Sequence, residues 1–219
     1  GTAAGTSATP AVTLSTGSTT DAFGFSVAAA GDVNGDGFDD VLVGAYWADQ
    51  VFLYLGSGSG LSAVAATKLE GSASSGYFGY TMAGAGDVNR DGYDDVIVGD
   101  FTEDEAYIYL GSAAGLAATA ATTLDGDGNQ DFGYSVSGAG DVNGDGFDDV
   151  IVSTTTCDGS EIAAYVYPGS ALGVALTPFA AIVGFDDPDN YCMILAADAG
   201  DINGDGYGDV LVGAPFWDC

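Results

Sequence analysis

The chain has no histidine and almost no basic side chains. Lys68 and Arg90 stand against 32 acidic residues, which leaves the 219-residue chain with a net charge of −30. Without histidine, no serine or cysteine nucleophile has an imidazole base, so hydrolases built on such pairs are excluded. Two bases cannot neutralise a phosphate backbone, which argues against nucleic acid as a partner. We therefore predict neither an enzyme nor a nucleic-acid-binding protein.

Long apolar runs and paired cysteines are also missing. No run is long enough to span a bilayer, and the first residues lack the basic segment and apolar core of a signal peptide. Either a leader has been removed or the sequence is a piece of a longer protein. The three cysteines, Cys157, Cys192 and Cys219, form no CxxC pair, which argues against zinc and redox motifs.

One acidic stretch of nine residues occurs four times, at 32–40, 87–95, 141–149 and 201–209. Each copy has oxygen-bearing side chains at positions one, three, five and nine and glycine at position six, a pattern that suits calcium. Position twelve, where an EF-hand carries an acid, is valine in every copy. Position seven is aromatic; we expect its carbonyl to bind the ion and its ring to pack inward. The predicted ligands, one calcium ion per copy, are Asp32, Asn34, Asp36, Phe38 and Asp40; Asp87, Asn89, Asp91, Tyr93 and Asp95; Asp141, Asn143, Asp145, Phe147 and Asp149; and Asp201, Asn203, Asp205, Tyr207 and Asp209.

The charge of the chain is concentrated in these stretches. Fifteen of the 32 acids lie in them, and position eight is aspartate in all but the last copy, which has Gly208. Two carboxylates about 5 Å apart repel by roughly 3 kcal/mol at an effective dielectric constant of about 20. Loops with several such groups need a counter-ion, and four calcium ions would bring the net charge to −22.

The segments around the acidic stretches repeat as well, with spacings of 55, 54 and 60 residues between successive copies. Apolar segments precede each stretch, at 25–30, 80–85 and 134–139, and β-branched runs follow it at 41–43, 96–98, 150–152 and 210–212. Two more short segments complete each unit, at 51–55 and 67–69, 106–110 and 122–124, and 164–167 and 180–183. Apolar residues on both alternating faces indicate strands covered on both sides. We predict an all-β fold of tandem four-stranded antiparallel blades of the β-propeller type.

The predicted blades divide the chain as a single repeat domain, residues 1–219. Residues 1–20 hold a strand of a preceding blade (10–14), and repeats follow at 21–70, 71–125 and 126–184, with a partial repeat at 185–219. About three and a half to four repeats predict an incomplete propeller or one completed by assembly. Unpaired sheet edges favour association, so the expected partners are other copies or other segments of the same protein.

With the motifs on both sides of the loops, the chain resembles the FG-GAP repeats of integrin α-subunit propellers. Phe-Gly precedes the first three loops at 23–24, 78–79 and 132–133, and Gly-Ala-Tyr or Gly-Ala-Pro follows at 44–46 and 213–215. Similar repeats occur in bacterial surface proteins and some fungal lectins. The chain departs from the pattern at Ser153-Thr154-Thr155, in place of Gly-Ala-Pro, and at Tyr191-Cys192, in place of Phe-Gly.

The resemblance implies calcium in the hairpin between the first two strands of each blade, and ligand contacts on the opposite face. The corresponding residues here, Tyr46-Trp47, Asp100-Phe101 and Phe216-Trp217, would lie on that opposite face with their aromatic rings. There they either stack on a glycan or protein ligand or pack between neighbouring blades. Cys157 and Cys192 would lie near this face, in adjoining units, and a disulfide of Cys192 with either Cys157 or Cys219 is compatible with the pattern.

Three functions are consistent with these features. The first is an extracellular calcium-binding structural module of a surface, matrix or filament protein, in which calcium rigidifies each blade. The second is an integrin-like or lectin-like adhesion module that binds a protein or glycan through its aromatic loops. The third is a non-catalytic propeller attached to an enzyme elsewhere in a longer chain. The remaining acids, such as those at 103–105 and 186–187, are interpreted as solvated surface.

Overall fold

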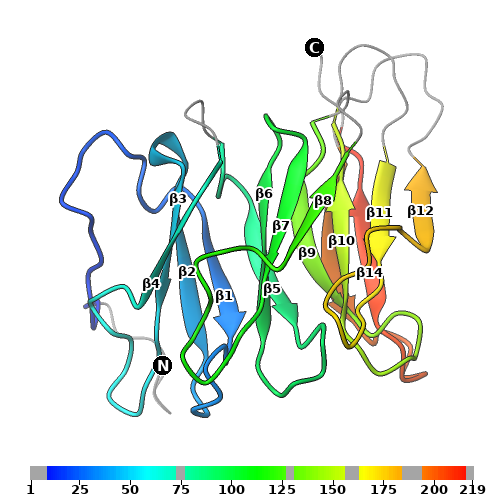
Figure 1. Cartoon of the computed structure of the whole chain (residues 1–219), viewed down its shortest axis with the longest axis horizontal. Helices are drawn as coiled ribbons and strands as arrows, with labels where there is room; N and C mark the ends of the chain where they lie inside the picture. Colours follow the sequence, from blue (N-terminus) through cyan, green and yellow to red (C-terminus); the bar gives the residue numbers. More distant parts are fainter. Residues whose placement is uncertain (1–8, 73–76, 127–130, 156–162, 184–193, 216–219) are drawn as a thin grey trace.

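The computed structural model describes residues 9–72, 77–126, 131–155, 163–183 and 194–215. Within them the chain forms a row of antiparallel sheets standing side by side (Figure 1). We call these sheets blades 1 to 4. Blade 1 contains β1 (Val27–Gly31), β2 (Asp40–Ala45), β3 (Gln50–Tyr54) and β4 (Thr67–Glu70); blade 2 contains β5 (Met82–Gly86), β6 (Asp95–Asp100), β7 (Glu105–Tyr109) and β8 (Thr122–Asp125); blade 3 contains β9 (Ser135–Gly140), β10 (Asp149–Ser153), β11 (Ala163–Tyr167) and β12 (Ala180–Val183); and the described part of blade 4 contains β13 (Leu195–Gly200) and β14 (Asp209–Gly213).

Each blade follows the chain in simple order, so that consecutive strands pair as antiparallel neighbours. Blade 2 lies inside the row, and every residue of its second strand, β6, is buried. The first strands of successive blades lie beside one another: β1 beside β5, β5 beside β9, and β9 beside β13. This arrangement confirms the predicted all-β fold of propeller-type blades, here as an open row.

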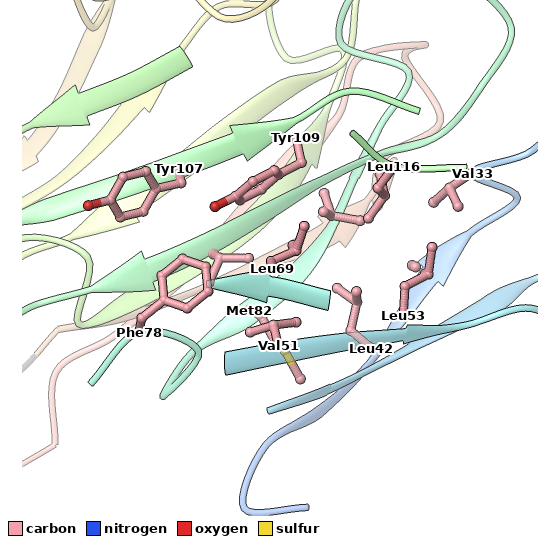
Figure 2. Packing of buried hydrophobic residues seen from close by; sticks show 13 residues of the cluster. Val33, Leu42, Val51, Leu53, Leu69, Phe78, Met82, Tyr107, Tyr109 and Leu116 are labelled. Carbon is pink, nitrogen blue, oxygen red and sulfur yellow. The ribbon is translucent and has the colours of Figure 1, made fainter. Parts of the chain in front are cut away.

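The hydrophobic core lies between blades rather than within one sheet. Between blades 1 and 2, aliphatic side chains of blade 1, among them Leu42 and Leu53, face the rings of Phe78, Tyr107 and Tyr109 of blade 2 (Figure 2). A second cluster joins blades 2 and 3, and a third joins blades 3 and 4. Because both faces of an inner blade are covered, its strands are apolar on both alternating faces.

Glycines of the Phe-Gly and Gly-Ala motifs bring neighbouring blades together. Gly79 has φ +79° and lies against Gly44 of the preceding blade, where a Cβ on Gly44 would overlap its carbonyl. Gly99 and Gly133 meet in the same way at the next junction. Blade 3 has Ser153 at the corresponding position, and its hydroxyl donates to the carbonyl of Ile194 at 2.7 Å. The departure from the motif therefore replaces a close backbone contact with a side-chain hydrogen bond.

Some expectations from the sequence differ from the structure. Residues 10–14 form no strand, and none of the sheets among the described residues includes them. The first strands begin two residues later than expected in blades 1 and 2, after the turn that contains Phe-Gly. The three cysteines and Phe216-Trp217 lie outside the described residues. In the described chain no helix is both long and apolar enough to cross a bilayer.

Candidate functional site

The four acidic loops lie at the same end of each blade, along one edge of the row, and each joins the first and second strands of its blade (Figure 1). In blade 1 the loop runs from the end of β1 at Gly31 to the start of β2 at Asp40. Glycine at position six has φ between +88° and +92° in all four loops, a left-handed conformation that other residues adopt at a cost. The same local residues therefore produce the same hairpin four times.

Side chains of the loop hold its own backbone in place. In the first loop the Asp36 N–H donates to Asp32 Oδ1 at 3.0 Å and to Asn34 Oδ1 at 2.9 Å. The Gly37 N–H donates to Asp32 Oδ2 at 2.7 Å, and the Phe38 N–H donates to Asp36 Oδ1 at 3.1 Å. The acidic side chains at positions one and five and the asparagine at position three are thereby turned toward the inside of the loop.

The other three loops repeat these four hydrogen bonds with distances between 2.8 and 3.1 Å. The acceptors are Asp87, Asn89 and Asp91; Asp141, Asn143 and Asp145; and Asp201, Asn203 and Asp205. Such agreement means that the loop conformation is a property of the nine residues and does not depend on the neighbours of each blade. Hydrogen bonds from three backbone N–H groups also lower the pKa of Asp201.

The carboxylates at position nine occupy a different environment. Asp40, Asp95 and Asp149 are fully buried at the start of the second strand. Each accepts two backbone N–H groups; Asp95, for example, accepts those of Val88 at 2.9 Å and Gly111 at 2.7 Å. Asp209 accepts the N–H of Ile202 at 2.8 Å. These carboxylates therefore connect the acidic loop to the turn after the third strand.

Burial of the carboxylates at position nine raises their pKa above the usual range for aspartate. The pKa of Asp95 is raised to about 7 and that of Asp149 to about 6, and burial raises the pKa of Asp40 as well. The charges at positions one and five act in the same direction. In the described residues the one ion pair joins Lys68 to Glu70, away from the loops. A cation near position nine would stabilise the charged form of these carboxylates and lower their pKa.

The structure does not gather all the predicted ligands around one point. Among the described residues, no three Asp, Glu, His or Cys side chains converge closely enough to hold a metal ion. The donor set nevertheless suits calcium, because it consists of carboxylate, amide and carbonyl oxygens. An oxygen that accepts one N–H also keeps a second lone pair for a cation. The residues thus fit calcium by chemistry, while the binding itself stays a prediction.

Two of the aromatic rings at position seven, Tyr93 and Tyr207, lie against the preceding loop and do not pack inward as expected. The ring of Tyr93 lies against Gly35 of the preceding loop, and that of Tyr207 lies against Gly144. Phe38 and Tyr207 remain 44% and 48% exposed. Tyr93 and Tyr207 therefore contribute to the contact between neighbouring blades.

Position eight has a role that the sequence reading missed. The Asp32 N–H donates to Asp94 Oδ2 at 2.7 Å, and the Asp87 N–H donates to Asp148 Oδ2 at 2.8 Å, so each of these carboxylates joins its own loop to the preceding one. At the last junction Gly208 lies against the backbone of blade 3, where a side chain would overlap the carbonyl of Ala139. In the sequence, this role could have been recognised from the aspartates at position eight of three loops and the glycine in the fourth.

The opposite end of the blades carries a cluster of aromatic rings. We call it the aromatic cluster and define it as Phe25, Tyr46, Trp47, Tyr77, Tyr80, Phe101 and Tyr134. Centroid distances between neighbouring rings run from 4.6 to 6.0 Å, within the range of favourable aromatic pairs. Tyr46 is 9% exposed, whereas Trp47 is 65% and Phe25 is 54% exposed. Some rings thus pack between blades, and others face solvent.

Tandem propeller-type blades with acidic hairpin loops define the class of this protein. Residues 32–98 match the FG-GAP-like repeat family, and residues 132–164 and 195–218 match the FG-GAP repeat family. Human integrin alpha-7 is 38% identical over 157 residues, which cover 66% of this chain and 13% of that protein. Integrin alpha-4 of Xenopus laevis is 38% identical over 154 residues, or 62% of this chain and 14% of that protein. Integrin alpha-V of Gallus gallus is 40% identical over 96 residues, or 40% of this chain and 9% of that protein.

The chain belongs to the FG-GAP repeat family, and its repeats are like those of integrin α subunits. The family resemblance seen in the sequence is therefore confirmed. The chain spans only a small part of the length of these relatives.

Proposed function

We propose that this chain is an extracellular calcium-binding structural module in which calcium stiffens each FG-GAP blade. The observation that carries the proposal is the fourfold repetition of one hydrogen-bonded loop, with its acidic side chains already turned inward. Residues at positions one, three, five and nine and the carbonyl at position seven would hold the ion. When bound, calcium would supply the positive charge that the loops lack.

Charge and burial support this proposal. Fifteen acids in four loops are accompanied by one base, Arg90. Among the described residues neither Asp95 nor Asp149 forms an ion pair with a basic side chain, and burial raises the pKa of both. A divalent cation in each loop would offset the repulsion among these carboxylates. The near-absence of lysine and the four loops together favour the extracellular compartment, where calcium is abundant.

A calcium titration of the chelated protein tests the proposal. Isothermal calorimetry is expected to count about four sites, and saturation at 1,000 times the dissociation constant adds about 4 kcal/mol of stability per site. Asp87→Asn is expected to remove one site while leaving the fold intact, and Glu103→Gln, an exposed change outside the loops, retains all four. A thermal midpoint that does not change on chelation would contradict the proposal.

A second candidate function is recognition of a protein or glycan by the aromatic cluster. The specific observation is the exposure of Trp47 and Phe25 on the end of the blades opposite the acidic loops. Exposed aromatic faces stack on sugars and anchor protein interfaces. The relatives are integrin α subunits, which supports an adhesion-type module.

A glycan array and a pull-down from extracellular extracts, each with the Trp47→Ala variant, separate the two candidates. Recognition predicts that binding is lost while the thermal midpoint is retained. Leu172→Ala is the matched control, because Leu172 is 94% exposed and lies outside the aromatic cluster. Binding that is unaffected by Trp47→Ala would remove the recognition hypothesis and leave the structural one.

A further inference from the structure

Arg90 is the one basic side chain in the four acidic loops, which together carry 15 of the 32 acids. It stands at position four of the second loop, where the other loops have Gly35, Gly144 and Gly204 with φ between +72° and +76°. Arg90 keeps the same left-handed conformation, with φ +59°, although a residue with a side chain adopts it at a cost. The second loop therefore retains the shared backbone and adds one positive charge to it.

Position four of a loop faces the next loop along the row. A Cβ on Gly35 in the first loop would overlap the ring of Tyr93 from the second loop. A Cβ on Gly144 in the third loop would likewise overlap the ring of Tyr207 from the fourth loop. Because the junctions repeat, the side chain of Arg90 extends from the second loop toward the third.

The guanidinium group of Arg90 lies against the backbone of Gly146, at position six of the third loop. A Cβ on Gly146 would overlap Nη1 of Arg90. The same point is open space at the other three glycines of position six, Gly37, Gly92 and Gly206. The Gly146 N–H donates to Asp141 Oδ2 at 2.8 Å, so the guanidinium stands beside the backbone that binds this carboxylate. The positive charge carried by the second loop is thereby located at the third loop.

The third loop also differs from the others in one internal hydrogen bond. In the first, second and fourth loops the asparagine amide at position three donates to the aspartate at position five, at 2.9 to 3.1 Å. In the third loop Asn143 Nδ2 donates instead to Asp149 Oδ1, at 3.4 Å, so that Asp145 Oδ2 does not receive this donor. Among the described residues Arg90 forms no ion pair, so its charge acts on the acids of the third loop through its field and not through a bond to one carboxylate.

We infer that Arg90 is a built-in counter-ion of the third loop and makes this loop a weaker calcium site than the first and second loops, which carry acids at the same positions. The inference rests on the proposed calcium function and deepens it, because it says which site differs and which residue causes the difference. A positive charge beside the loop stabilises its carboxylates in the absence of metal and repels an incoming divalent cation. A unit charge roughly 8 Å from a divalent ion in water-like surroundings weakens binding about fivefold.

A site-resolved calcium titration tests the inference, by two-dimensional NMR of the chelated full chain with calcium alone as the probe. The amide signals of the glycines at position six report on one loop each, Gly37 on the first, Gly92 on the second and Gly146 on the third. At about 0.01 M salt, where the screening length is about 30 Å, the Gly146 signal is expected to respond at about fivefold higher free calcium than the other two. At about 1 M salt, where this length is about 3 Å, the difference should disappear.

Three variants separate the charge of Arg90 from its side-chain volume. Arg90→Gln removes the charge and keeps a long side chain, and it should bring the Gly146 response to the same free calcium as those of Gly37 and Gly92. Arg90→Lys keeps the charge, so its Gly146 signal should still respond late. Lys68→Gln is the matched control, because it removes the other base of the chain, on β4, and should change none of the responses. If circular dichroism shows that Arg90→Gln does not fold, Arg90→Gly replaces it, since glycine holds this position in the other loops.

A readout without calcium tests the same charge in the metal-free protein. In chelator at about 0.01 M salt, Arg90→Gln should lower the thermal midpoint, whereas Arg90→Lys should retain it. An unchanged midpoint in Arg90→Gln, a wild-type Gly146 signal that responds together with those of Gly37 and Gly92, or a late response that persists in Arg90→Gln would overturn the inference and leave the calcium proposal standing. If none of the loop glycines responds to calcium, the calcium proposal is overturned and the inference with it.

Discussion

Single glycines decide how closely two loops can approach. Gly31 and Gly86 stand immediately before the first two acidic loops, with φ of +75° and +73°. A Cβ on Gly31 would overlap the carboxylate of Asp94, and one on Gly86 would overlap that of Asp148. The same carboxylates bind the N–H of the residue that follows each glycine. At the residue scale, the hydrogen bond from one loop to the position-eight aspartate of the next loop therefore requires glycine, for both space and backbone conformation.

We expect Gly86→Ala to lower the free energy of unfolding by more than about 2 kcal/mol, because it adds both backbone strain and a clash. Gly60→Ala is the matched control: Gly60 has φ +103° but open space around it. Gly60→Ala should lower the free energy of unfolding only through backbone strain, by about 1 kcal/mol. Urea denaturation measures both variants, and equal costs would show that the clash is relieved by movement of Asp148.

Asp100 is a buried acid outside the loops, and it predicts a pH dependence. Burial, with the charge of Asp49, raises its pKa, so the folded state holds the proton more tightly than the unfolded chain. Stability from this group is therefore present at acidic pH and is lost as pH rises above about 4, through its folded pKa. We expect Asp100→Asn to reduce the loss of stability between about pH 4 and pH 7, because asparagine does not ionise.

Thermal melts across this pH range measure the effect. The hydroxyl of Thr102 donates to Asp100 Oδ1 at 2.9 Å, and asparagine keeps that acceptor. Glu103→Gln removes a charge nearby at an exposed position and should leave the slope unchanged. A pH profile that is identical in Asp100→Asn and wild type would show that Asp100 does not control it.

At the scale of elements, the sequence repeats once per blade, whereas the hydrophobic core that stabilises the fold lies between blades. Hydrogen bonds within a blade run between consecutive strands, but the three hydrophobic clusters span adjacent blades. One blade alone would therefore leave both apolar faces in water. Phe132 illustrates this: its ring is 1% exposed and lies in the cluster shared by blades 2 and 3.

Replacing Phe132 with alanine should cost about 3–5 kcal/mol, because it leaves a cavity beside Tyr165 and Tyr167. Phe179→Ala makes the same chemical change where the ring is 49% exposed, and its cost should be no more than about 0.5 kcal/mol. Chemical denaturation of the two variants measures the difference. Similar costs would mean that the inter-blade core does not determine stability.

At the scale of the whole molecule, charge opposes folding. The folded chain carries −30, with 15 of its 32 acids in the four loops, and a compact shape brings these charges closer than an unfolded chain does. Salt reduces this repulsion without binding a specific site. Calcium acts at the loops themselves and should therefore make the chain less dependent on salt.

In chelator, raising sodium chloride from about 0.01 M to 0.1 M shortens the screening length from about 30 Å to about 10 Å. We expect the thermal midpoint to rise over this range, and to rise less when calcium is saturating. Potassium chloride should act equally, because screening depends on ionic strength and not on the identity of the cation. A midpoint that is independent of salt in chelator would refute this account of the charge.

Local features of the structure were predictable from the sequence. The nine-residue loop forms through hydrogen bonds that span two to five residues, so its residues determine its shape without help from the rest of the chain. Short apolar and β-branched runs separated by glycine-rich turns likewise predicted the strands, their order and the fourfold repetition. Asp32, Asn34 and Asp36 could therefore be identified as candidate ligands by spacing alone.

Contacts between blades were decided only by the tertiary structure. Asp94 meets the Asp32 N–H across 62 residues of sequence, and Tyr93 meets Gly35 across a similar distance. The aromatic cluster likewise draws its rings from connections in three blades. Such partners depend on how one blade is rotated and displaced relative to the next, and a repeat spacing carries no information on that placement. The sequence by itself determined the repeated loop, and the packing of blades determined which of its residues join one loop to another.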